Sequence, residues 1–318
     1  MRYVLRADAS LSIGSGHVMR SSAIAEELIA RGEEVVFVGR ISDLPWVRER
    51  ISLLGFSDIY YSPKDFISNP KSDVLLLDSY EIALDDNFIF LENWLHVVTV
   101  VDELTPNYSC ALRIHPGLDS GWVGESEIPI LAGPKYIPLR SSLSKNIAST
   151  SKESEILKIV VVAGGSDPHD LVLEISKTLA SFPDLFEVYL FTNFSSNFAS
   201  DPRFHFIEIG SKLDEVSRNA NLILTTASTS SLEFIARGLC VGIACAIDNQ
   251  KQYYGELGRL GVAAKIGSFS SPSGWSLDIN TIHRLVNEPS LRENLTGKAA
   301  GLIDFHGAGR IVDAVTCL

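Results

Sequence analysis

Cysteine is scarce in this 318-residue sequence, and its placement follows no metal-binding pattern. The four cysteines form no CxxC pair, and no cluster of histidines completes a zinc site. Cys240 and Cys245 lie within "LCVGIACAI", which predicts a buried strand, in keeping with the usual burial of free cysteine. The sequence therefore predicts no metal site, and we expect no cofactor.

Long hydrophobic runs and an excess of positive charge are lacking too. The apolar stretches fall far short of the ~20 residues that a membrane helix needs, and the opening "MRYVLRAD" becomes charged too early for a signal peptide. A net charge of −12 argues against broad binding of nucleic acid or of anionic membranes. We expect a soluble, cytoplasmic protein without stable membrane insertion. A small anionic ligand stays possible, because helix N-termini bind anions locally.

Short apolar runs alternate with helical patterns along the chain, which indicates βα units around parallel sheets. In the first half, strands are predicted at "YVLRA", "EVVFVG", "VLLLDSY", "HVVTVVDE" and "CALRIH". In the second half they are predicted at "LKIVVV", "FEVYLFT", "FHFIEIG", "NLILTTAS" and "CVGIACAI". Continuous apolar character is typical of strands that are buried on both faces. Helices are predicted over 21–31 (closed by Gly32), 169–181, 231–237 and 250–260, and from about 289 onward.

A polar tract, "SSLSKNIASTSKESE", divides this alternating pattern into two similar halves. We expect an N-terminal Rossmann-like domain over 1–142, a linker over 143–157 and a C-terminal, nucleotide-binding Rossmann-like domain over 158–318. The last helix can pack back on the N-terminal domain. Each half begins with a strand, a glycine turn and a helix. The predicted fold is therefore α/β, with two parallel sheets that face a central cleft, and a ligand beyond the carboxyl ends of the strands.

The first glycine turn, "GSGHVMR", contains an unusual histidine. Gly14 and Gly16 allow backbone amides to approach an anion at a helix start, but the third glycine of a dinucleotide fingerprint is missing. His17 and Arg20 lie one helical turn apart on the same side. An imidazole at a helix N-terminus tends to stay neutral, so His17 is a candidate general base, and Arg20 can pair with a carboxylate or touch a phosphate. The alternative for His17 is a simple capping role.

The stretch "RADASLSIGSGHVMRSSAIAEEL" resembles the opening of the nucleotide-sugar hydrolases of pseudaminic acid biosynthesis, metal-independent relatives of the GT-B glycosyltransferases. The family pattern R-x-D-x-S-x-x-x-G-x-G-H-x-x-R is matched by Arg6, Asp8, Ser10, Gly14, Gly16, His17 and Arg20. Similar segments recur in order: "LLLDSY", "VVDE", "GPKYIPLR", "VVAGGSDPHD", "TTASTSSLEFIARGL" and "IDNQKQ". The resemblance implies a GT-B-like fold and removal of UDP from UDP-2,4-diacetamido-2,4,6-trideoxy-β-L-altrose.

The resemblance also implies roles for individual residues. His17 is expected to activate water at the anomeric carbon, while Asp8 and Tyr80 line the sugar side and orient the base or the water. The diphosphate is expected at Gly165 and the helix start that follows it, and Glu233 at the ribose hydroxyls, which a carboxylate can clamp. The other residues expected to bind substrate or nucleotide are Ser10, Gly14, Gly16, Arg20, Arg140, Gly164, Asp167, Ser228, Ser231, Asn249 and Gln250.

Three positions depart from the family pattern. Ser79 replaces the histidine of an Asp-His-Tyr triplet, and His115 and Asp170 lie near places where the family has asparagine. Such differences can change which sugar a site accepts. Read without the family, Asp8 is equally a turn-forming residue, Tyr80 a packing residue and Glu233 a solvent-facing helix residue.

The predicted function is a metal-independent hydrolase that releases the nucleotide from a nucleotide-activated, UDP-linked deoxyamino sugar. The first alternative is a GT-B glycosyltransferase in which His17 deprotonates an acceptor. Its acceptor surface would include residues 41–56, although these read as an ordinary amphipathic helix. The second alternative is a non-catalytic nucleotide-sugar-binding protein, and the missing glycine disfavours a nicotinamide dehydrogenase. The expected partner is a small nucleotide-sugar molecule, bound by a monomer or a weak dimer.

Overall fold

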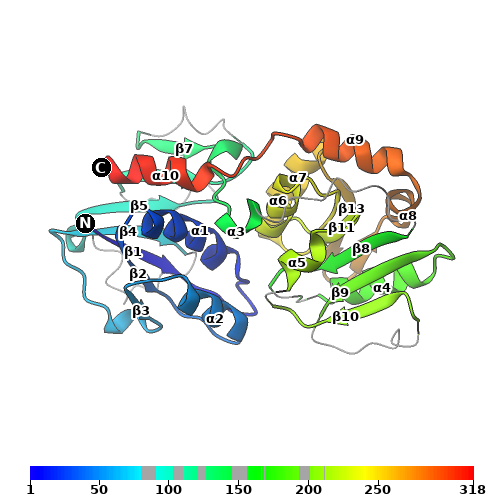
Figure 1. Cartoon of the computed structure of the whole chain (residues 1–318), viewed down its shortest axis with the longest axis horizontal. Coiled ribbons are helices and arrows are strands. Elements are labelled where there is room, and N and C mark those ends of the chain that lie inside the picture. Colours follow the sequence, from blue (N-terminus) through cyan, green and yellow to red (C-terminus); the bar gives the residue numbers. More distant parts are fainter. Residues whose placement is uncertain are drawn as a thin grey trace. The chain divides into compact units, whose positions relative to one another are not determined.

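The computed structural model describes residues 1–79, 91–102, 110–119, 127–144, 156–165, 167, 169–192, 201–210 and 212–318. The chain divides into two compact units (Figure 1). Unit 1 comprises Met1–Ser141 and Asp304–Leu318, and unit 2 comprises Ser142–Ile303. Most of the predicted linker, residues 145–155, lies outside the described part of the chain.

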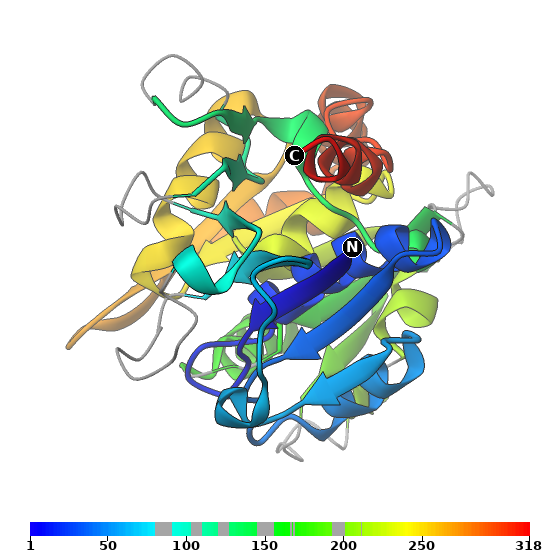
Figure 2. The ribbon, with the colours of Figure 1, turned by 90° about the vertical axis from the view of Figure 1, so that its left-hand side faces the viewer.

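Unit 1 is built on a parallel sheet whose strand order reverses at its centre. Its described strands, in spatial order, are β3 (Asp58–Tyr60), β2 (Glu34–Val38), β1 (Arg2–Ala7), β4 (Asp73–Asp78), β5 (His96–Val100), β6 (Leu112–His115) and β7 (Ile130–Ala132). Each neighbouring pair is parallel. Figure 2 shows β1 between β2 and β4. From β1 the chain first adds β2 and β3 on one side of the sheet and then β4 to β7 on the other. This is the order of a Rossmann fold.

The apolar runs form strands because both faces of the sheet are covered. On β1, Tyr3 and Leu5 belong to one buried cluster together with residues of helices, whereas Val4 belongs to a second cluster on the other face. Trp94 and the partly buried Phe66 pack in that second cluster. Side chains on a strand point alternately to the two faces, so a strand covered on both sides reads as continuously apolar.

Three helices contribute to the first of these clusters. They are α1 (Gly16–Ala30), α2 (Pro45–Leu53) and α10 (Gly307–Thr316). Helix α1 begins five residues before the predicted start at Ser21, so His17 lies inside its first turn. It ends as predicted, because Gly32 adopts a left-handed φ of 83° directly after it. Helix α2 supplies Val47 and Ile51 from the predicted amphipathic segment 41–56.

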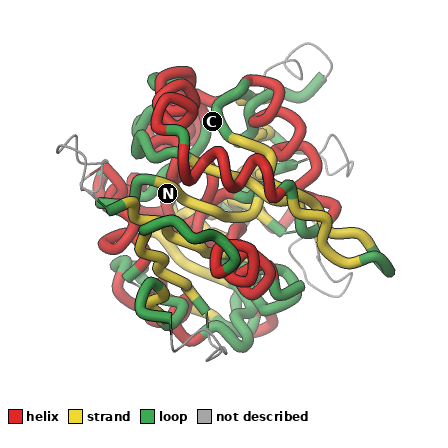
Figure 3. The backbone as a smooth tube through the Cα atoms, turned by 90° about the vertical axis from the view of Figure 1, so that its right-hand side faces the viewer, coloured by secondary structure: helices red, strands yellow, loops and turns green. Residues whose placement is uncertain are grey.

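Unit 2 repeats the same strand order and adds an antiparallel hairpin. Its described strands, in spatial order, are β10 (Phe204–Ile207), β9 (Phe186–Phe191), β8 (Leu157–Val162), β11 (Leu222–Thr226), β12 (Val241–Cys245), β13 (Ala264–Ser270) and β14 (Gly274–Leu277). The β13–β14 pair is antiparallel and projects from the unit (Figure 3). The helices are α4 (Leu171–Ala180), α5 (Leu213–Ser217), α6 (Thr229–Ala236), α7 (Lys251–Leu260), α8 (Ile279–Asn287) and α9 (Pro289–Ala299); α3 (Ser141–Ser144) lies at the boundary between the units.

The long βα elements were predicted, and the short or peripheral ones were missed. The sequence pattern predicted no strand at β3, at β7 or in the β13–β14 hairpin, and no helix at α8. The start of α8 did carry a usable signal, because Asp278 caps it by accepting a hydrogen bond from the Thr281 amide. No helix within the described residues has both the length and the apolar character needed to span a membrane.

Candidate active site

The two central strands of unit 1 bring distant polar residues together at their carboxyl ends. Strand β1 leads into the glycine turn and α1, and the adjacent strand β4 ends at Asp78. The register pairs Ala7 with Asp78. Because His17 lies in the first turn of α1, its ring reaches Asp78 across the place where the strand order reverses. In open α/β sheets this is the usual position of a ligand site.

His17 and Asp78 form a buried histidine–carboxylate pair. The Nδ1 atom of His17 lies 2.6 Å from Oδ1 of Asp78, and both side chains are almost fully buried. Nδ1 also lies 3.1 Å from Nη2 of Arg20, which can only donate, but the contact with Asp78 is the shorter one. We therefore assign the ring proton to Nδ1, where it forms a hydrogen bond to the Asp78 carboxylate. In the neutral ring the lone pair then resides on Nε2. A base oriented in this way by a carboxylate is the arrangement that nucleophile activation requires.

Arg20 connects this pair to a second carboxylate. Its Nε and Nη2 donate to the two oxygens of Asp78, at 2.6 Å each. Its Nη1 and Nη2 also donate to Asp102, two residues after the end of β5, at 2.5 and 3.0 Å. The two bidentate contacts use four of the five N–H donors of the guanidinium. Of the two roles considered for Arg20, the structure shows carboxylate pairing.

The charge state of Asp78 is fixed by its partners. Burial alone would raise the pKa of Asp78, but the charges of Arg20 and His17, and the hydrogen bonds from both, hold the pKa well below its usual range. Ser21 adds a further hydrogen bond from its hydroxyl to Oδ2, at 3.1 Å. Asp78 is therefore an anion at every pH at which the protein is expected to work.

Asp8 connects the ends of three strands. Its Oδ1 accepts hydrogen bonds from Arg6 and from the backbone amide of Arg40, and its Oδ2 accepts one from the Ser79 hydroxyl. The Asp8 side chain is buried, and Arg6 is buried completely. Asp8 is therefore more than a local turn former, because it ties the loop after β1 to those after β2 and β4.

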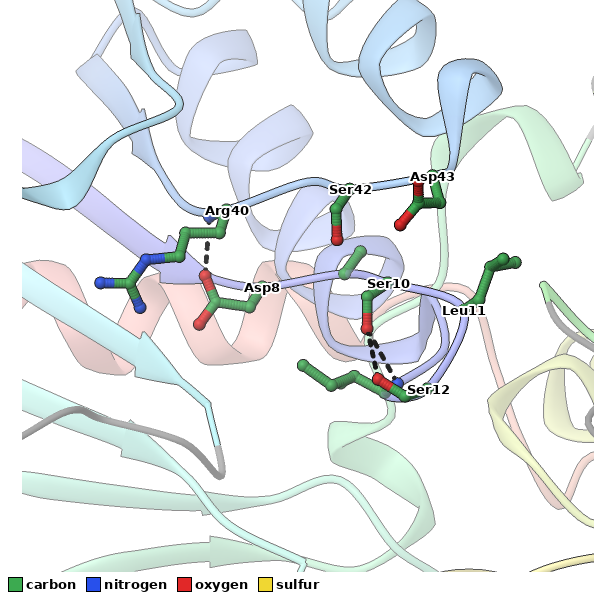
Figure 4. Close-up of a pocket in the computed structure, with 9 residues that line it drawn as sticks. Asp8, Ser10, Leu11, Ser12, Arg40, Ser42 and Asp43 are labelled. Carbon is green, nitrogen blue, oxygen red and sulfur yellow. Dashed lines mark hydrogen bonds between the residues drawn. The ribbon is translucent and has the colours of Figure 1, made fainter.

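The loop between Asp8 and α1 borders a polar pocket. The Ser10 hydroxyl accepts a hydrogen bond from the Ile13 amide and lies 2.9 Å from the Ser12 hydroxyl, and Gly14 turns the chain at a φ of 83°. Figure 4 shows the Ser10 and Ser12 hydroxyls turned toward each other, while Ser42 and Asp43 lie on the neighbouring loop after β2. The pocket has a volume of about 410 Å³, and its lining residues are Asp8, Ala9, Ser10, Leu11, Ser12, Ile13, Arg40, Ser42 and Asp43.

In unit 2, the glycine turn after β8 leads to a helix start that is already occupied. The Asp167 carboxylate accepts hydrogen bonds from the amides of Leu171 and Val172, at 2.7 and 2.9 Å. Burial raises the pKa of Asp167. Gly164 and Gly165 form the turn, with Gly164 at a φ of 87°. The expected diphosphate position at this helix start stays a prediction, and Asp167 already accepts hydrogen bonds from two of its amides.

The second central strand of unit 2, β11, leads directly into α6. Ser228 stands at the N-cap position, and its side chain makes no capping hydrogen bond. The Ser231 hydroxyl donates to the Ser228 carbonyl at 2.6 Å, and the Thr226 hydroxyl donates to the Ser228 hydroxyl at 3.1 Å. Glu233 is buried within the helix, so it is not the solvent-facing residue of the alternative interpretation.

The remaining predicted residues are not part of the His17–Asp78–Arg20 contacts given above, or they lie outside the described residues. Gln250 accepts a hydrogen bond from the Ala246 amide, which closes the turn after β12, and the neighbouring Asn249 is exposed. Arg140 is buried just before α3. Tyr80 lies outside the described residues. Among those described, no group of three or more His, Cys, Asp or Glu side chains is arranged to hold a metal ion.

Sequence reasoning did not include Asp78 and Asp102 among the site residues. Both follow apolar runs, in "VLLLD" and "VVD", at the ends of neighbouring parallel strands. Acidic residues that follow parallel strands lie at the same edge of the sheet. This position could have identified Asp78 and Asp102 as candidate site residues. Their contact with Arg20 depends on the strand order, which the sequence pattern alone does not give.

Two curated proteins resemble the chain in sequence, and no protein-family model matches it. An uncharacterized protein of Methanocaldococcus jannaschii is 24% identical over 80% of this chain and 57% of its own length. A UDP-2,4-diacetamido-2,4,6-trideoxy-beta-L-altropyranose hydrolase of Campylobacter jejuni is 24% identical over 56% of this chain and 66% of its own length. The chain thus spans less than two thirds of either relative.

Solved structures match the chain over nearly its whole length. The MurG protein of Acinetobacter baumannii is 12% identical with a TM-score of 0.68, and the match covers 100% of both chains. The UDP-GlcNAc 2-epimerase of Neisseria meningitidis, solved bound to UDP-GlcNAc, is 11% identical with a TM-score of 0.61 and the same coverage. The chain has a two-domain, Rossmann-like GT-B fold. At such low identity, these matches establish the fold alone.

Proposed function

We propose that this protein is a hydrolase that releases the nucleotide from a nucleotide-activated, UDP-linked deoxyamino sugar. The observation that carries the proposal is the 2.6 Å contact between His17 Nδ1 and Asp78 Oδ1. Asp78 fixes the tautomer, and Nε2 becomes the proton acceptor. The resemblance to the Campylobacter jejuni hydrolase supports the choice of substrate. On this basis the reaction belongs to the biosynthesis of a pseudaminic-type acid or of a surface glycan.

In the proposed reaction, His17 takes a proton from water as the water oxygen bonds to the anomeric carbon. The bond between that carbon and the diphosphate oxygen breaks, and its electron pair leaves with the nucleoside diphosphate. General-base catalysis contributes about 10²–10⁴-fold. The remaining acceleration must come from positioning of the substrate and from stabilisation of the leaving group. No metal ion is required in this scheme.

The diphosphate is proposed to bind at the start of α6. Asp167 accepts hydrogen bonds from two amides at the α4 start, whereas the Ser228 side chain makes no capping hydrogen bond at the α6 start. Helix amides and the helix dipole favour a phosphate there. Glu233, one turn further along the same helix, is the proposed partner of the ribose hydroxyls. In unit 1, Asp8 and the Ser10 loop are the proposed sugar-side contacts.

A glycosyltransferase is the second candidate, and its support is the similarity of fold to a solved glycosyltransferase, the calicheamicin glycosyltransferase CalG4. In that reaction His17 would remove the proton from an acceptor hydroxyl instead of from water. The two candidates differ in whether nucleotide release needs an acceptor. The Asp78–His17 pair serves either reaction.

A panel of UDP-, CDP- and GDP-linked amino sugars tests the proposal. Purified protein should release free nucleotide from at least one UDP-linked substrate without any acceptor. His17→Gln should lower kcat by about 10²–10⁴-fold, while nucleotide affinity, measured by calorimetry, stays close to that of the wild type. His205→Gln, at an exposed position on β10, is the matched control. Release that requires an added acceptor would favour the transferase, and full activity of His17→Gln would reject the proposed base.

A further inference from the structure

The histidine–carboxylate pair is one end of a longer chain of charges. His17 contacts Asp78, Asp78 contacts Arg20, and Arg20 contacts Asp102, with the closest N–O separations between 2.5 and 2.6 Å. Nη2 of Arg20 also lies 3.1 Å from Nδ1 of His17, so the guanidinium charge faces the ring directly as well. The first three side chains are almost fully buried, and Asp102 is 18% exposed. Neither the sequence pattern nor the compared proteins assign a role to Asp102.

The charges in this chain balance only when the histidine is protonated. Arg20 is always cationic, and Asp102 and Asp78 together offer two negative charges. With a neutral His17 ring, the group carries one excess negative charge. When the ring accepts a proton, the excess disappears. If Asp102 were neutral, Arg20 would cancel Asp78, and the protonated ring would have no net counter-charge.

We propose that Asp102 is a positioning residue that acts through Arg20. By balancing the guanidinium, it leaves Asp78 available as the counter-charge of the imidazolium that forms when His17 takes a proton. This inference rests on the proposed function, in which His17 is the base. In this view the Arg20–Asp102 contact favours protonation of His17, in addition to linking α1 to the chain that follows β5.

Two further groups near this chain within the described residues, Ser21 and His115, do not supply the balancing charge. Ser21, on α1, is neutral and donates its hydroxyl to Asp78. His115, at the end of β6, donates Nδ1–H to the Val101 carbonyl at 3.0 Å. Burial lowers the pKa of His115 in spite of the nearby charges of Asp102 and Asp119, so its ring is neutral near pH 7. Asp102 is thus the described carboxylate that balances the charge of Arg20, while Asp78 contacts both Arg20 and His17.

Asp102→Asn tests the inference because it removes the charge and keeps the shape. The Asp78–Arg20 pair stays balanced, so the variant should fold. We expect kcat to fall about tenfold to a hundredfold, with KM nearly unchanged, because one charge is lost from a poorly solvated group. The acid limb of the kcat/KM profile should also move to lower pH, by about one unit.

A second measurement needs no substrate. In ¹⁵N-labelled protein, the ring signals of His17 can be assigned with His17→Gln and followed against pH. In Asp102→Asn the His17 signals should respond at a lower pH than in the wild type. An unchanged response would overturn the inference. A wild-type protein that turns over none of the nucleotide sugars would contradict the proposed function, and the ring signals would still decide the role of Asp102.

Two further variants separate charge balance from packing. The double variant Arg20→Gln with Asp102→Asn again has one excess negative charge, so the His17 response should return toward the wild-type pH. A role in packing alone predicts that the double variant stays at or beyond the single variant. Asp73→Asn is the matched control, because Asp73 is buried at the opposite end of β4 and pairs with Arg2. It should lower stability without moving the acid limb or the His17 response.

Discussion

At the scale of single residues, one nitrogen of the His17 ring is held by a carboxylate, and this determines what a change at Asp78 should do. Asp78→Asn keeps the side-chain size but offers a neutral amide that can present either its oxygen or its nitrogen to Nδ1. The ring tautomer is then no longer fixed, and the counter-charge is lost.

We expect Asp78→Asn to lower kcat by about 10²-fold or more, because the general base loses its orientation and its counter-charge. Steady-state kinetics on a UDP-linked amino sugar measures the effect. Ser79→Ala, next in sequence, is a suitable comparison, because the Ser79 hydroxyl donates a hydrogen bond to Asp8. Equal losses in the two variants would argue that the Asp78 effect is only structural.

Acid should weaken the folded state through the same carboxylate. The pKa of Asp78 is lower in the folded protein than the ~3.9 of an unfolded aspartate. Its stabilising contribution is therefore complete above about pH 5 and is lost as the pH falls below the unfolded value, where the unfolded chain binds the extra proton. The urea midpoints of wild type and Asp78→Asn should differ most near pH 7 and converge toward pH 3. A gap that stays constant with pH would contradict this assignment.

The residue scale also shows what sequence could and could not predict. His17 stood out because an imidazole is unusual in a glycine turn. Asp78 is 61 residues away in the chain, and Asp102 is 82 residues from Arg20. Their contacts arise from strand pairing, which brings β1, β4 and β5 together, so local patterns could not reveal them.

At the scale of elements, the ends of β1 and β2 approach so closely that only glycine fits. A Cβ on Gly39 would lie 1.8 Å from the Ala7 carbonyl oxygen. The loop that follows Gly39 carries the Arg40 amide that holds Asp8. The approach of these two strand ends therefore also shapes the pocket beside the Ser10 loop.

Gly39→Ala should destabilise unit 1 by more than about 2 kcal/mol, because the backbone must move to relieve the clash. Gly32→Ala is the matched control: its φ of 83° strains an alanine, but a Cβ there meets no atom within 4 Å. It should cost only about 1 kcal/mol. Urea denaturation followed by circular dichroism compares the two, and equal losses would refute the close-approach argument.

Which elements were predictable depended on burial. Strands β1, β4, β8 and β11 are covered on both faces, and their continuous apolar runs were recognised. The β13–β14 hairpin projects from unit 2, and its strands alternate buried and exposed positions weakly, so "AKIGSFSSPSGWSL" gave no clear pattern. Strands β3 and β7 have three residues each, too few to show a period.

At the scale of the whole molecule, unit 1 is assembled from two separate parts of the chain. Helix α10 places Ile311, Val312 and Val315 in the same buried cluster as β1 and α1. Gly307 approaches the Ile137 carbonyl so closely that a Cβ would lie 2.0 Å from the oxygen. The α/β class and the repeated strand–turn–helix device were evident from the sequence. The sequence also allowed the last helix to pack back on the N-terminal domain, but it did not identify the residues that this helix contacts, because an amphipathic pattern shows which face is buried and not which side chains cover it.

Val312→Ala should therefore destabilise unit 1, although Val312 lies far along the chain from the first segment of that unit, which ends at Ser141. Loss of two buried carbons and the resulting cavity cost about 2 kcal/mol. Hydrogen exchange in β1 and β4 should accelerate by about thirtyfold, whereas exchange in β8 and β11 should not change. Asp313→Ala, which removes only the exposed ion pair with Arg31, is the control and should have little effect. Equal acceleration in both units would contradict the assignment of α10.

The membership of α10 in unit 1 has a consequence for biosynthesis. A ribosome completes the strands of unit 1 early, but the helix that covers part of their apolar face is made only after all of unit 2. Chains that lack residues 304–318 should therefore leave the apolar face of unit 1 that α10 covers exposed to solvent, where a holdase chaperone could bind.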